Sequence, residues 1–168
     1  MARTHWFFQA AYYPAVTETV RDAIDRLNAQ RVQIGATLQS LSAGQISWRP
    51  PSGKWTIHEN LRHLVLTGFA HIQFLGLPEW EALNLSAPIE WRRRTKMVGD
   101  DGTPVGALLA AWEEVHSRAA VAAARFEGVA SDRLERHLQQ HLRHQSQHVL
   151  EIEKLLRAQA RLHRQLDT

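Results

Sequence analysis

The chain has 168 residues, of which 44% are hydrophobic and 22% are charged, and it carries a formal net charge of +3. These values are close to globular averages, so they exclude a disordered or fibrous chain and predict one domain spanning residues 1–168. Cysteine is absent, which excludes disulfides, cysteine-ligated zinc and a thiol nucleophile within the chain. Because no apolar run is long enough for a membrane span, we expect a cytoplasmic protein without a membrane partner.

The first predicted element is a helix from about Val16 to Leu41. Its apolar residues recur every three or four positions, as in a helix with one buried face. A stretch rich in glycine and proline follows, from Ser42 to Lys54, and is predicted to break the helix.

The second predicted helix begins at a capping box. Thr56 is a favourable N-cap residue, and Glu59 stands three positions later. The helix is predicted to reach about Leu75 and to end before Pro78. His58, in its first turn, is expected to be exposed.

A long connection follows, with several prolines and glycines between residues 76 and 104. It is predicted to hold one short helix near residues 79–85, and Trp80 and Trp91 are its best candidates for contact with a ligand. The basic run WRRR, residues 91–94, is read as a solvated loop. Since no nucleic-acid-binding motif accompanies this run, we expect no nucleic acid partner.

Two further helices complete the predicted fold. One runs from about Val105 to Phe126, and the other begins at Ser131 or Asp132 and extends to about Gln165. Strand signals are nearly absent. The sequence therefore predicts an all-α protein, a four-helix bundle with a long crossover connection between helices two and three.

The last helix carries four histidines within twelve residues: His137, His141, His144 and His148. His144 and His148 are spaced i, i+4, so both rings can reach one metal ion, although an edge of polar side chains without a ligand fits the spacing equally well. Two helical histidines bind a divalent ion weakly, so a metal site needs a third ligand from another helix. His63 on helix two is a candidate.

Helix two has a polar side that includes His63, Asn60 and Thr67. This side could line a substrate cleft, and Asn60 and Thr67 are candidate pocket residues. Periodicity leaves open whether His63 points inward.

Two segments resemble motifs of the DinB-like (YfiT-type) superfamily. RPPSGKWTIHENLRHL resembles the opening of its second helix, where Trp-Ser/Thr is followed by a histidine eight residues after the tryptophan, here Trp55 and His63. HQSQHVLEI resembles its HxxxH motif followed by isoleucine, here His144, His148 and Ile152. The order of the motifs and the plan of the helices match across almost the whole chain.

This resemblance implies a divalent metal ion, zinc or nickel, held by His63, His144 and His148. It also implies a metal-dependent enzyme acting on a small-molecule substrate, either a transferase of low-molecular-weight thiols or a hydrolase, and homodimers are common in the superfamily. Two departures put the reaction in doubt. Leu150 and Glu151 stand where members often have Gly-Gln, and Thr67 and Gly68 stand where many have an acidic residue.

Three neutral imidazoles leave zinc or nickel with an open coordination position, which is typical of catalytic sites. The ion can acidify a bound water or an exogenous low-molecular-weight thiol, which the cysteine-free chain would have to borrow. Glu151, one turn after His148, is a candidate to orient that ring or to act as general base, although an ordinary surface glutamate is the favoured interpretation of this position.

Other readings stay open. His141 could line the substrate mouth, could bind a second ion together with His137, or could have no role. The chain as a whole could be a non-catalytic metal-binding protein of a stress response, or a helical interaction module.

Overall fold

The computed structural model describes residues 20–76, 102–124 and 132–166, and these residues form helices and no strands. The helices are α1 (Val20–Gln39), α2 (Ala43–Ser47), α3 (Ile57–Gly76), α5 (Val105–Ala124) and α6 (Asp132–Leu166). This confirms the predicted all-α class. None of the described helices is both long and apolar enough to span a membrane.

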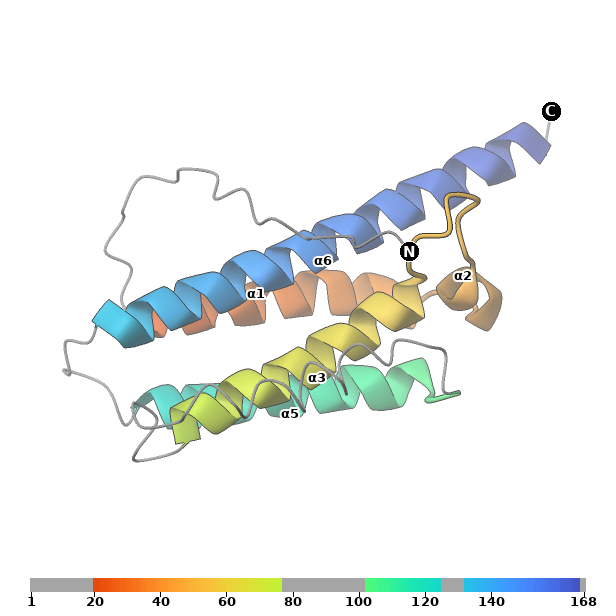
Figure 1. Cartoon of the computed structure of the whole chain (residues 1–168). Coiled ribbons are helices and arrows are strands. Elements are labelled where there is room, and N and C mark those ends of the chain that lie inside the picture. Colours follow the sequence, from red (N-terminus) through yellow and green to blue (C-terminus); the bar gives the residue numbers. More distant parts are fainter. Residues whose placement is uncertain (1–19, 77–101, 125–131, 167–168) are drawn as a thin grey trace, which may run out of the picture.

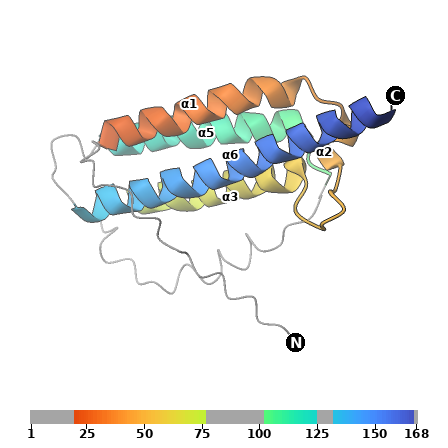
Figure 2. The same ribbon diagram turned by 90° about the horizontal axis from the view of Figure 1, so that it is seen from above.

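The four long helices form a closed ring. α1 packs against α5 and α6, and α3 packs against the same two helices from the other side (Figure 2). α3 and α5 run in the same direction, whereas α6 runs antiparallel to α3 (Figure 1). The end of α3 at Gly76 and the start of α5 at Val105 therefore lie at opposite ends of the bundle, as the predicted crossover requires.

The core lies between the four helices and is built from the predicted apolar stripes. Ile57 and Leu61 of α3 are fully buried, and so is Ile152 of α6, while Trp112 of α5 is 1% exposed. These side chains belong to one continuous apolar cluster that also includes residues of α1 and α2. Burial of this cluster is the main force that holds α3 against α6.

Hydrogen bonds confirm the capping box that begins α3. The Glu59 amide donates to Thr56 Oγ1 at 3.1 Å, and the Thr56 amide donates to Glu59 Oε2 at 2.8 Å. Arg49 donates to the other carboxylate oxygen at 2.6 Å. Burial alone would raise the pKa of Glu59, but the hydrogen bonds from Arg49 and Thr56 outweigh it and lower that pKa. The start of α3 is therefore fixed, and with it the positions of residues one and two turns later.

One prediction for this region is incomplete and another is wrong. The predicted break contains the short helix α2, capped by Ser42, whose hydroxyl accepts from the Gln45 amide while the Gln45 side chain accepts from the Ser42 amide. His58 is 3% exposed instead of solvent-exposed. Its Nε2 donates to the carbonyl oxygen of Thr103 at 2.9 Å, because the segment that precedes α5 covers this turn of α3.

Several other predictions lie outside the described residues. They are the start of the first helix at residues 16–19, the short helix at 79–85, Trp80, and the WRRR run at 91–94.

Candidate metal centre

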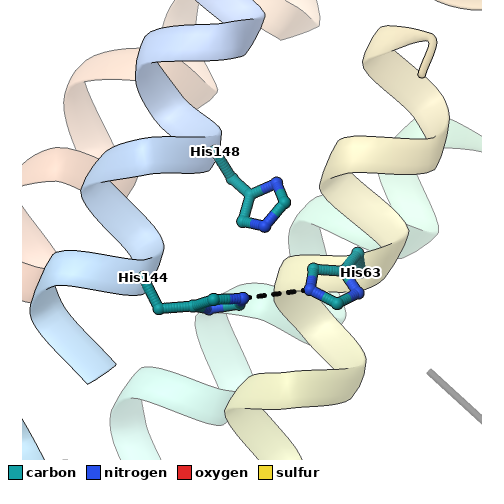
Figure 3. A group of neighbouring side chains, drawn as sticks. All are labelled: His63, His144 and His148. Carbon is teal, nitrogen blue, oxygen red and sulfur yellow. Dashed lines mark hydrogen bonds between the residues drawn. The ribbon is translucent and has the colours of Figure 1, made fainter. Parts of the chain in front are cut away.

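The structure brings His63 of α3 together with His144 and His148 of α6 (Figure 3). Each ring offers one nitrogen, and these three nitrogens all lie within 4.8 Å of one another. His63 Nε2 and His144 Nε2 are 3.0 Å apart. The i, i+4 pair on one helix thus faces the single histidine of the antiparallel neighbour, as a three-histidine metal site requires.

Burial keeps the two α6 rings neutral. It lowers the pKa of His144 to about 4, with a further contribution from nearby His63. Burial also lowers the pKa of His148 to about 3, and the neighbouring His144 and His63 add to the effect. At neutral pH these rings carry lone pairs, which is the protonation state that a metal ion needs.

Asn60 sets the orientation of the His148 ring. Its side-chain amide donates to the carbonyl oxygen of Thr56 at 2.8 Å, which leaves Asn60 Oδ1 facing His148. That oxygen accepts from His148 Nδ1 at 2.9 Å. Nδ1 therefore holds the proton and Nε2 carries the lone pair. A hydrogen bond of this kind to the distal nitrogen is usual for histidines that ligate metals.

Trp55 forms one wall of the site. Its ring stacks on His148, with centroids 5.7 Å apart and an interplanar angle of 16°, and it meets His63 edge-on at 5.1 Å. The sequence motif contains this tryptophan but does not predict its contact with the histidines. The available signal was its place directly before the N-cap Thr56, which holds it over the first two turns of α3.

The predicted pocket residues on α3 are close to the histidines. Asn60 is 3% exposed and takes part in the hydrogen bonds just described. Thr67 is half-buried, and its hydroxyl donates to the backbone carbonyl oxygens of His63 and Leu64. Their proposed contact with a substrate stays a prediction.

Glu151 and His141 have other neighbours. The Glu151 carboxylate accepts from Lys154 at 2.5 Å and from Lys54 at 3.3 Å. The hydrogen bond from Lys154 is the largest of the effects that lower the pKa of Glu151, which makes this group a weaker base. The His141 ring is 3.9 Å from that of His71.

The fold and the site define a class, an all-helical protein with a cluster of three histidines between two antiparallel helices. The sequence profile of the DinB superfamily matches residues 26–166, a range that contains all three histidines. The chain belongs to the DinB superfamily. Comparison with curated proteins gave no match, and comparison with solved structures also gave none.

Proposed function

We propose that the chain binds one divalent metal ion, zinc or nickel, through His63, His144 and His148, and that it is a metal-dependent enzyme. The observation that carries the proposal is the convergence of three ring nitrogens within 4.8 Å from two different helices. Membership of the DinB superfamily supports the same ligand set.

The residues present fit such an ion. His144 and His148 have pKa values far below neutrality, so they need not release a proton before they ligate. Asn60 holds His148 in the tautomer that offers Nε2. All three histidines are half-buried, so the group is shielded without being sealed from a small molecule.

An ion held by three imidazoles would supply Lewis acidity, which lowers the pKa of a bound thiol or water and so generates a nucleophile near neutral pH. The chain's own residues would contribute ligands, ring orientation through Asn60, and a flat aromatic wall through Trp55. Because the chain has no cysteine, a thiolate would have to come from a low-molecular-weight thiol. Glu151 as the proton acceptor remains a proposal.

The test is a pair of assays on the zinc- and nickel-loaded protein. One follows the addition of a small thiol such as glutathione to an electrophile, and the other follows ester hydrolysis without a thiol. Thiol-dependent turnover that is lost in His63→Ala and His144→Ala would assign a transferase, and thiol-independent turnover lost in the same variants would assign a hydrolase. Equal rates in the wild type and both variants would overturn the catalytic proposal and favour the alternative of a metal-binding protein without turnover.

A further inference from the structure

A second group of histidines lies farther along the same pair of helices. It consists of His71 on α3 and of His137 and His141 on α6. His71 Nδ1 is 2.8 Å from His137 Nε2. The His71 ring centroid is 4.6 Å from that of His137 and 3.9 Å from that of His141.

The second group repeats the plan of the first. His137 and His141 are an HxxxH pair like His144 and His148, and each pair faces one histidine of α3. The step between the groups is seven residues back along α6 and eight residues forward along α3, His63 to His71. Because the two helices are antiparallel, these steps point the same way. At a rise of about 1.5 Å per residue, the groups are roughly 11 Å apart.

Two histidines of the second group are also in the neutral state that binding of a metal ion requires. Burial lowers the pKa of His71 well below its usual value, and the nearby His141 and His137 lower it further. Burial lowers the pKa of His141 to about 3, with smaller effects from His144, His116 and His137. Both rings are therefore neutral at physiological pH and present lone pairs.

One atom of this group lacks a partner. His141 Nδ1 is buried and has no hydrogen-bond partner among the described residues. A buried polar atom in this condition is unfavourable, and a ligand is one of the explanations for its presence. Unlike the first group, these three rings do not offer nitrogens that all lie within 4.8 Å of one another. A site therefore requires the His141 ring to rotate about its Cβ–Cγ bond, a torsion that has a broad distribution in histidine.

We propose that His71, His137 and His141 form a second divalent metal site, of the zinc type, about two helical turns from the first. Its three imidazole ligands would take the same class of ion. Two dications at roughly 11 Å repel each other, so the second ion binds more weakly than the first when both sites are filled. The proposal does not depend on the first group being occupied or catalytic.

Calorimetric titration of the metal-free full chain with zinc chloride, with native mass spectrometry to count bound ions, tests the proposal. Three variants are compared with the wild type: His63→Ala/His144→Ala, which removes the first group, His71→Gln/His137→Gln, which removes the second, and His163→Ala, a histidine of α6 that belongs to neither group. Circular dichroism confirms that each variant is folded. His137→Gln alone replaces the second variant if that variant does not fold, because His137 is half-buried.

We expect two ions per chain in the wild type and in His163→Ala. His71→Gln/His137→Gln should keep the tighter ion and lose at least tenfold in affinity for the weaker one, and His63→Ala/His144→Ala should keep one ion. The second site is overturned if the weaker zinc-binding step is unchanged in His71→Gln/His137→Gln. It is also overturned if the wild type binds a single ion and only His63→Ala/His144→Ala removes it. A single ion removed only by His71→Gln/His137→Gln would support the second site and contradict the proposed function of the first.

Discussion

Asn60 connects the start of a helix to the proposed metal ligand. Its amide is anchored on the Thr56 carbonyl, within the capping turn, and its oxygen accepts the His148 Nδ1 proton. Because both ends of this amide are engaged, its orientation is fixed. The tautomer of His148 is therefore determined by the fold before any ion binds.

We predict that Asn60→Ala weakens zinc binding about 10- to 100-fold, since loss of such a hydrogen bond to a metal ligand typically costs that much. Asn60→Asp retains an acceptor for His148 and should recover most of the affinity. Thr67→Val is the matched control on α3, because among the described residues the Thr67 hydroxyl bonds only backbone carbonyls of its own helix. Competition titration against a chromophoric chelator measures all three. Unchanged affinity in Asn60→Ala would contradict the positioning role.

The candidate ligands could be predicted from short motifs, but their partners could not. HxxxH spacing made His144 and His148 candidates, and the family resemblance selected them together with His63 of the helix-two segment. The contact of Asn60 with His148 depends on the register between α3 and α6, and the burial of His58 depends on Thr103, 45 positions later in the chain. Helical periodicity predicts neither of these two contacts.

At the scale of elements, the packing of α3 on α5 depends on the small size of Gly68. A Cβ atom built on Gly68 would lie 2.5 Å from Val115 Cγ1, closer than side chains tolerate. The glycine therefore allows the two parallel helices to approach closely, one turn beyond the His63 position.

We predict that Gly68→Ala lowers the free energy of unfolding by about 1–3 kcal/mol, because overpacking in a filled core forces neighbouring side chains to shift. Gly106→Ala on α5 is the control, since nothing lies within 4 Å of its added methyl group and alanine favours the helix by about 0.5–1 kcal/mol. Urea denaturation of both variants checks the contrast. Equal effects of the two substitutions would show that the helix contact does not constrain Gly68.

The elements themselves were largely predictable because their ends carry strong local signals. Thr56 and Glu59 located the start of α3, and α1 ends at Gln39, two residues before the predicted end at about Leu41. The short helix α2 was missed although Ser42 and Gln45 form a capping box. Glycine and proline in the surrounding stretch masked a signal that lay in the sequence.

At the scale of the whole molecule, the buried histidines make the metal-free protein sensitive to acid. The pKa values of His144 and His116 fall to about 4 and those of His148 and His141 to about 3, chiefly through burial, and that of His71 is well below normal for the same reason. Unfolding would expose these rings and restore values near 6.5. The unfolded chain therefore binds more protons than the folded one between about pH 6.5 and pH 4.

We predict that the stability of the metal-free protein is nearly constant above about pH 7 and falls as the pH drops from 6.5 toward 4. Each neutral histidine contributes about 1.4 kcal/mol per pH unit within this window. Urea denaturation with a chelator present, repeated at several pH values, should give a slope at pH 5 that corresponds to about two or more protons. A flat profile between pH 7 and pH 5 would contradict the burial of these rings.

The shared plan of the two histidine groups, in which each pair on α6 faces one histidine of α3, is also a property of the whole molecule. The row of four histidines on α6 is visible in the sequence, but the sequence does not show that His63 and His71 each face one pair. That relation follows from the antiparallel course of α3 and α6 and from a register set by the apolar core. Only the assembled bundle reveals it.

The most direct test of the central claim is the metal content of the protein purified without a metal-affinity column and from cells grown without added nickel. The account predicts about one tightly bound zinc or nickel ion per chain in the wild type and in the control His163→Ala. It predicts that His63→Ala and His144→Ala lose this ion, so that any metal they keep is the weaker ion assigned to His71, His137 and His141. A wild type that contains no ion and binds zinc and nickel more weakly than micromolar, or variants that contain as much metal as the wild type, would contradict it.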